Sequence, residues 1–212
     1  WENPIVEPEP GLGYVWAPDR AWSDFRDPYI YRENDQWHML VTAKQLIDRN
    51  RGVIWHGVSD DLRDWSDVGP MFVNDADTLW YHVLESPQYH TIGSWHHLMF
   101  GVYDDDGITY VATQDKSSWS MGDGVKIDYG IAPEVDEFDP GHRIFSRLTP
   151  FYKPSGVDLS YVIRLDTLLV EPDGGNLTIH KPNPFANDWD VYTGVANLGN
   201  PVFGDNPTWR YE

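Results

Sequence analysis

The feature of this sequence that most constrains its fold is an internal repeat. Ile54–Ser66 and Ile108–Ser120 start 54 residues apart, and both end in the pattern Ser/Thr-x-Asp-x-x-x-Trp-Ser. Upstream of each, a proline (Pro28 or Pro87) leads through strand-like residues and a turn to a Trp-His pair. A period of about 40 to 50 residues built from short strands is typical of β-propeller blades. The sequence therefore predicts an all-β fold, since helical periodicity is almost absent.

We expect one β-propeller domain over residues 1–212, built from antiparallel four-stranded blades. It divides into an irregular N-terminal segment (1–24), three blade-like units (25–74, 84–128 and 129–180) and a partial blade or tail (181–212). The strand-like stretches of the third unit are Arg143–Leu148, Leu159–Arg164 and Thr167–Val170.

The length of the chain bears on whether the blades of the propeller close into a ring. At roughly 50 residues per blade it holds about four blades, and an open propeller exposes unpaired strand edges, which proteins usually cover. We expect residues 1–24 or 190–212 to cover the open edge, or else a second chain, as in a homo-oligomer.

The composition argues against nucleic acid and membranes as binding partners. The net charge of −19 repels nucleic acid and anionic membranes, and no run of 18 apolar residues marks a membrane span. The 5 lysines against 25 aspartates fit either a protein adapted to salt or an ordinary acidic extracellular enzyme. We expect a secreted or extracellular protein.

The sequence predicts no metal site and no cofactor. Asp104–Gly107 is acidic, but it fits a hairpin turn in which glycine supplies the positive φ. The remaining spaced ligands of a calcium loop are absent around it.

Two stretches carry the candidate chemistry. One contains Arg26-Asp27-Pro28 and the other contains Glu85-Ser86-Pro87. Proline suits the first residue of a strand, so Asp27 and Glu85 are expected at strand entrances, facing one another across a central pocket.

These motifs resemble the Arg-Asp-Pro and Glu-Cys-Pro motifs of the invertase and β-fructosidase glycoside hydrolases of family 32. The arabinanase and xylosidase family 43 shares the layout. Asp139–Ser146 and Leu169–Leu177 are weakly similar to the Asp-Phe-Tyr-Ala and Leu-x-x-Asp-Gly-x-Leu segments of family 32. The resemblance covers roughly residues 20–180 and implies a five-bladed propeller.

The resemblance also implies roles. Glu85 becomes the general acid, and Asp27 holds sugar hydroxyls and stabilises the oxocarbenium-like transition state. Arg26 is expected to keep Asp27 ionised, and burial beside Val83-Leu84 to favour the protonated form of Glu85. The residues expected to bind the substrate are Arg26, Trp22, Trp80 and Tyr81.

One part of the family pattern is missing. The family carries a third carboxylate, an aspartate in a blade well before Arg-Asp-Pro, whereas 26 residues precede Asp27 here. Trp1–Pro4 is similar to the family's Trp-x-Asn-Asp-Pro opening but lacks the aspartate, and Asp19 and Asp24 are candidate stand-ins. Ser86 replaces the family's cysteine.

Three classes of function stay open. The first is a glycoside hydrolase acting on fructosyl or arabinosyl furanosides. The alternative is a catalytically inactive or incomplete propeller that binds carbohydrate, and a third is a propeller that serves as a platform for protein partners. In a purely structural interpretation, Asp27 and Glu85 cap strand ends or pair with arginine.

Overall fold

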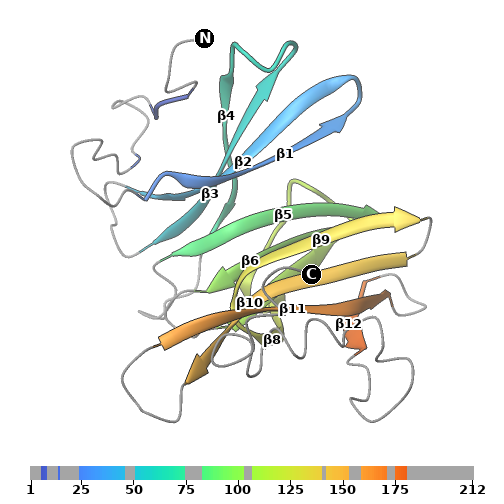
Figure 1. Cartoon of the computed structure of the whole chain (residues 1–212). Helices are drawn as coiled ribbons and strands as arrows, with labels where there is room; N and C mark the ends of the chain where they lie inside the picture. The colour runs from blue at the N-terminus through green and yellow to red at the C-terminus, as the bar shows by residue number, and fades with distance from the viewer. Residues whose placement is uncertain are drawn as a thin grey trace.

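The computed structural model of the chain describes residues 6–8, 14, 24–45, 51–74, 83–102, 107–139, 142–152, 159–170 and 175–180. Its strands form three four-stranded antiparallel sheets, each with strands in sequence order (Figure 1). The first sheet holds β1 (Arg26–Glu33), β2 (Gln36–Lys44), β3 (Gly52–Ser59) and β4 (Ser66–Val73). The second holds β5 (Leu84–Ile92), β6 (Trp95–Val102), β7 (Gly107–Thr113) and β8 (Val125–Tyr129). The third holds β9 (Ile131–Asp139), β10 (His142–Tyr152), β11 (Leu159–Val170) and β12 (Leu177–His180).

The two copies of the sequence repeat form the same hydrogen bond in the turn that follows the third strand of each sheet. The Ser59 hydroxyl accepts a hydrogen bond from the Asp61 backbone N–H at 3.2 Å after β3, and Thr113 accepts one from Asp115 at 3.0 Å after β7. Such side-chain to backbone bonds fix local turns without help from distant residues. The shared turns and strand order confirm the prediction of antiparallel four-stranded blades.

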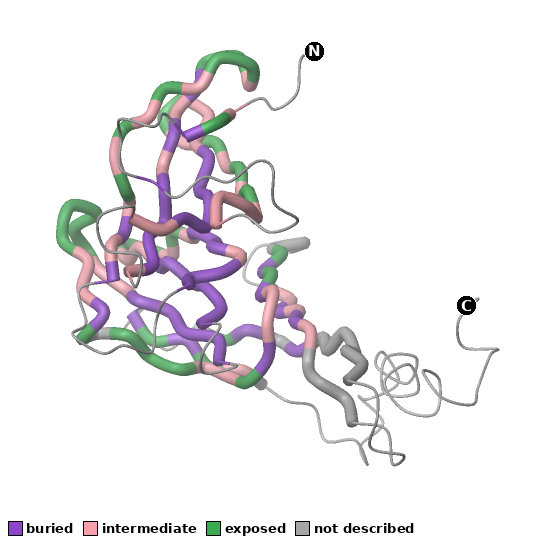
Figure 2. The backbone as a smooth tube through the Cα atoms, turned by 90° about the vertical axis from the view of Figure 1, so that its left-hand side faces the viewer, coloured by how far each residue is buried: buried purple, intermediate pink, exposed green. Residues whose placement is uncertain are grey.

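The cores lie between the sheets, as a propeller requires. Leu40, Ile54 and Phe72 of the first sheet meet residues of the second sheet, and Phe72 stacks on Phe100 at 5.6 Å. A second core joins the second and third sheets. The second sheet is therefore covered on both faces, which explains the unbroken apolar run in β6, where alternate residues point to opposite cores. Figure 2 shows the buried backbone concentrated in this middle layer.

The indole after each repeated turn packs on the corresponding face of its sheet. Trp119 joins the core between the first two sheets, and Trp65 packs against the cluster on the outer face of the first sheet. Trp65 and Trp119, the tryptophans of the repeated pattern, thus occupy equivalent places, each between the third and fourth strands of its sheet.

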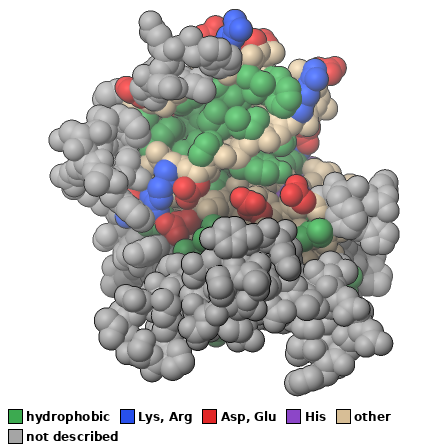
Figure 3. Space-filling model, viewed as in Figure 1, with side chains coloured by type: hydrophobic (Ala, Val, Ile, Leu, Met, Phe, Trp, Pro, Cys, Tyr) green, Lys and Arg blue, Asp and Glu red, His purple; other side chains and the backbone are tan. Residues whose placement is uncertain are grey.

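The outer face of the first sheet is apolar. Its buried cluster contains Met39, Val41, Ala43, Val53 and Trp55. Hydrophobic side chains also gather on the part of the surface that the upper half of Figure 3 shows. Val6 packs against this cluster, and Tyr14 belongs to it and bridges to Gln45. These are residues of the N-terminal segment that was expected to cover an open edge. Apart from Glu7 and Pro8, its other residues up to 23 lie outside the described part, as do residues 190–212.

The third sheet differs from the sequence prediction in two ways. Leu159–Arg164 and Thr167–Val170 are one strand, β11, because the intervening Asp166 is buried against Arg147 instead of breaking the strand. The first strand, β9, was not predicted, since proline and acidic residues obscure its apolar alternation. The expected number of blades was about four, and the described residues form three sheets.

No helix among the described residues is long and apolar enough to cross a membrane.

Candidate active site

The first strand of each sheet begins with the same backbone irregularity. Asp27, Ser86 and Ala132 have positive φ angles of 57, 49 and 51°, and a proline follows each of them. The strand register shifts at each of these places, and proline is tolerated there because it has no N–H to pair. In this shared frame Ser86 is the counterpart of Asp27, and Arg26 is the counterpart of Glu85. The two strands are equivalent, but Glu85 lies one position earlier in the shared pattern than Asp27 does.

Arg26 joins three acidic side chains at the start of β1 and β5. Its Nη2 binds Glu85 Oε1, its Nη1 lies 3.1 Å from Asp24 Oδ1, and its Nε lies 3.7 Å from Asp27 Oδ2. The Glu85 side chain is 12% exposed and that of Asp27 is 33% exposed. The predicted carboxylates Asp27 and Glu85 therefore contact the same guanidinium, and Glu85 is the less solvent-exposed of the two. We call Asp24, Arg26, Asp27 and Glu85 the carboxylate cluster.

Both the first and the second sheet donate hydrogen bonds to Asp27. Asp27 Oδ2 accepts from the Ser86 backbone N–H at 3.3 Å and from the Thr42 hydroxyl at 3.4 Å. Lys44 Nζ lies 3.4 Å from Asp24 Oδ2. Thr42 and Lys44 end β2, which runs antiparallel to β1, so the hairpin register brings them beside the cluster. The sequence did not single out Thr42 or Lys44. Pairing the two strands outward from the Glu33–Gln36 turn would nevertheless have placed both residues opposite the start of β1.

Other predicted site residues cannot be placed in this cluster. Trp22, Trp80 and Tyr81 lie outside the described residues, as do Asp19 and Asp104–Asp106. Within the described ranges, no group of three or more His, Cys, Asp or Glu side chains has the arrangement of a metal site.

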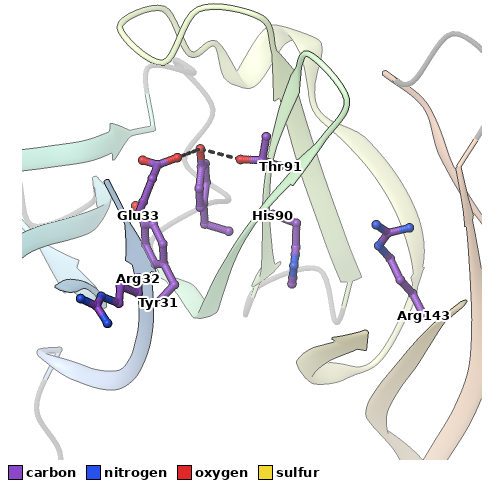
Figure 4. A pocket seen from close by; sticks show the side chains of 7 residues that line it. Tyr31, Arg32, Glu33, His90, Thr91 and Arg143 are labelled. Atoms are coloured by element: carbon purple, nitrogen blue, oxygen red, sulfur yellow. Dashed lines mark hydrogen bonds between the residues drawn. The ribbon is translucent and has the colours of Figure 1, made fainter. Parts of the chain in front are cut away.

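A pocket of about 340 Å³ lies at the opposite ends of β1 and β5 (Figure 4). Five residues separate Asp27 from Arg32 and Glu85 from His90, which amounts to on the order of 15 Å along each strand. The lining residues are Tyr31, Arg32, Glu33, Tyr89, His90, Thr91 and Arg143. The inner strands thus carry two polar regions, one at each end.

Behind this pocket, aromatic rings connect the first two sheets. His38 stacks on His56 at 5.1 Å and on Tyr31 at 4.9 Å, and Tyr31 lies 4.8 Å from Tyr89. Tyr89 in turn stacks on His96 at 5.9 Å. We call these five residues the ring ladder.

Polar contacts tie the ring ladder together. His38 Nδ1 lies 2.9 Å from His56 Nε2, and the Tyr89 hydroxyl lies 2.7 Å from His96 Nδ1. Burial, followed by the charge effect of His38, lowers the pKa of His56 to about 4. Burial also lowers the pKa of His96. The lowered pKa keeps His56 and His96 neutral at neutral pH, and nothing in the spacing of these residues predicted the ladder.

Comparison with known proteins gives a consistent family. The family model for the glycosyl hydrolases family 32 N-terminal domain matches residues 6–145. A sucrose-6-phosphate hydrolase of Escherichia coli is 32% identical over 88 residues, and a raffinose invertase of the same organism is 31% identical over 88 residues. Each alignment covers 42% of this chain and 18% of the relative, so the matched stretch is less than a fifth of those proteins.

Solved structures agree on the fold. A family 32 β-fructofuranosidase of Bombyx mori superposes with a TM-score of 0.61 at 16% identity, covering 86% of this chain and 40% of that one. A GH43 β-xylosidase/α-arabinofuranosidase from a compost microbial metagenome gives a TM-score of 0.54 at 13% identity, covering 74% and 57%. At these identities the likeness shows the β-propeller fold alone.

Proposed function

Because this chain belongs to glycoside hydrolase family 32, whose N-terminal domain matches residues 6–145, we propose that it hydrolyses furanosides of the fructosyl type. The names of the relatives, a sucrose-6-phosphate hydrolase and a raffinose invertase, support a fructosyl substrate. The arabinosyl alternative rests on the GH43 fold likeness, which carries no substrate information at 13% identity. A secreted location remains part of this proposal.

The observation that supports the proposal best is the carboxylate cluster. Asp27 and Glu85 come from neighbouring inner strands and meet at one arginine, at the ends where both strands begin. Cleavage of a glycosidic bond needs one carboxyl group to protonate the leaving oxygen and a second to stabilise positive charge on the sugar.

The environments of the two carboxylates suggest how the roles divide. Glu85 is largely buried, whereas a third of the Asp27 side chain is open to solvent. Asp27 is also anchored by Ser86 N–H and Thr42, which suits a group that keeps its place while it holds sugar hydroxyls. In this proposal Glu85 is the general acid and Asp27 the stabiliser, with Arg26 orienting both.

The experiment compares three proteins with sucrose and raffinose as substrates. Glu85→Gln keeps the shape of the side chain and loses the proton, so hydrolysis should fall by about a hundredfold or more while sugar binding stays close to the parent value. Asp27→Asn should weaken both. Equal hydrolysis by Glu85→Gln and the unmodified protein would overturn the assignment of the acid.

A carbohydrate-binding protein without hydrolysis is the second candidate, and one observation favours it. Asp24 is the described candidate for the family's third carboxylate, but Arg26 and Lys44 already contact its two oxygens. A carboxylate held by two cations is a poor nucleophile, because its charge is already compensated. Sugar binding by the unmodified protein without any release of fructose would select this candidate.

A further inference from the structure

Lys44 contacts the carboxylate cluster, but the proposed division of roles in hydrolysis does not use it. It is the last residue of β2, and two residues of the same strand face the second sheet, Leu40 in the core and Thr42 at Asp27. Side chains two positions apart share one face of a strand, so Lys44 faces the second sheet as well. Only 17% of its side chain is exposed, which is low for a lysine. Lys44 is therefore a largely buried cation beside the start of β1.

A continuous line of contacts runs from Lys44 to the proposed acid. Lys44 Nζ lies 3.4 Å from Asp24 Oδ2, and Asp24 Oδ1 accepts a hydrogen bond from Arg26 Nη1 at 3.1 Å. The same guanidinium binds Glu85 through Nη2, and its Nε lies 3.7 Å from Asp27 Oδ2. A guanidinium is planar and rigid, so a contact that fixes one of its edges also fixes the direction of the other donors. Lys44 can therefore act on the acid without touching it.

The charges of the cluster do not cancel when every group is ionised. Three carboxylates, Asp24, Asp27 and Glu85, meet two cations, Arg26 and Lys44. One proton shared among the three acids brings the cluster to neutrality. Burial disfavours the charged form of an acid, and the side chain of Glu85 is the least exposed of the three, at 12%. The count of two cations therefore suits a cluster that holds one proton, on the group proposed as the acid.

The neighbouring strands contribute solvent-exposed charges. The strand partner of Lys44 in β3 is Gly52, which has no side chain. On β9, which lies beside β5, Glu134 and Asp136 are exposed, so water and salt screen them. Asp136 acts on Tyr29, since burial and then this carboxylate raise the pKa of Tyr29 to about 12. A change in the charge of Lys44 is therefore expected to be felt first by the carboxylate cluster.

We propose that Lys44 is a positioning residue for hydrolysis, a role that rests on the proposed function. Through Asp24 it holds the Arg26 guanidinium in place against the acid. Its charge also sets the pH range in which the acid keeps its proton. In this role Asp24 links two cations and does not act as a nucleophile.

The first measurement is the pH dependence of sucrose hydrolysis at low ionic strength. Lys44→Met removes one positive charge from the cluster, so the acid holds its proton more tightly. The alkaline limb of the profile should therefore move up by about half a pH unit. Lys44→Gln removes the same charge with a polar side chain and should move the limb as far, which keeps the test valid if the methionine variant does not fold.

Two controls separate this role from packing. Lys44→Arg keeps the charge and should restore the limb of the unmodified protein. Lys126→Gln removes an equal charge from the exposed part of β8 and should leave the limb in place. The proposal is wrong if the limb stays in place when Lys44 loses its charge, or if Lys126→Gln moves it equally.

The second measurement does not depend on catalysis. Nitrogen-15 NMR follows the exchange of the Arg26 Nε–H with water, and the signal is identified by its loss in Arg26→Lys. Lys44→Met should speed this exchange by about threefold or more, because the guanidinium is held less firmly, and Lys44→Arg should not. If exchange speeds up but no protein hydrolyses sucrose or raffinose, the proposed function is wrong and the link from Lys44 to Arg26 stands. Unchanged exchange in Lys44→Met overturns the positioning role whatever the hydrolysis shows.

Discussion

The two ends of β1 and β5 carry different side-chain chemistry. At the starts of the strands, three carboxylates gather around Arg26 and one lysine. At the far ends, stacked rings cross from β3 to β6, and the ion pair of Lys116 with Glu33 lies beside them. The carboxylate cluster depends on charge balance, whereas the ring ladder contains His56 and His96, whose lowered pKa keeps them neutral. The two ends should therefore respond differently to loss of a charge, to pH and to salt.

The largest effect is expected from removing the central cation. Arg26→Met leaves Glu85 largely buried without its partner, so the free energy of unfolding should fall by about 3 kcal/mol. Chemical denaturation at pH 7 measures this. Arg32→Met is the matched control, because Arg32 pairs with a fully exposed carboxylate and should change little. The double variant Arg26→Met/Glu85→Gln should recover most of the loss, and failure to do so would show that Arg26 acts through packing alone.

Acidification should weaken the ring ladder next. The pKa of His56 is about 4 in the folded chain against 6.5 when unperturbed, because burial and then His38 disfavour the charged form. A lowered histidine pKa means that this contribution to stability is complete above pH 6.5 and is lost as pH falls toward 4. The expected loss from this group is about 3 kcal/mol over that window.

The measurement is the difference in unfolding free energy between the unmodified chain and His56→Gln from pH 7 to pH 4.5. The unmodified chain should lose its advantage as the pH falls. A difference that stays constant across this window would show that His56 titrates normally.

A smaller effect on stability is expected from the backbone conformation at Asp27, and two variants separate it from the effect of the side-chain charge. Its φ of 57° is tolerated by asparagine but strained for a β-branched residue. Asp27→Val should therefore cost about 1–2 kcal/mol more than Asp27→Asn in thermal or chemical unfolding. Equal losses in both variants would mean that the carboxylate, and not the backbone, governs stability at this position.

The smallest effect is expected at the rim of the far end. Lys116 is more than a third exposed, so Lys116→Met should reduce stability by less than about 1 kcal/mol despite its bond to Glu33. High salt should shrink even this difference, because it screens exposed charges. A loss as large as that of Arg26→Met, measured in the same denaturation series, would remove the contrast between the two ends.

The sequence by itself determined the features that depend on neighbouring residues. The turn hydrogen bonds of Ser59 and Thr113 join residues two or three positions apart, and they repeat with the strands, so the blade order could be read directly. The motifs around Asp27 and Glu85 also indicated the family that the comparison confirmed. These signals need no knowledge of how one sheet sits against the next.

Tertiary structure alone decided which side chains meet across sheets. The rotation between blades brings Arg26 to Glu85, 59 residues away, and aligns the rings of Tyr31 and Tyr89. Within the third sheet, the pairing of β10 with β11 places Asp166 against Arg147, so that an acidic residue lies inside a strand where the pattern predicted a break. No periodicity along the chain encodes that rotation, because it results from the packing of the apolar cores between the sheets. The same rotation brings Arg143 to the pocket beside His90.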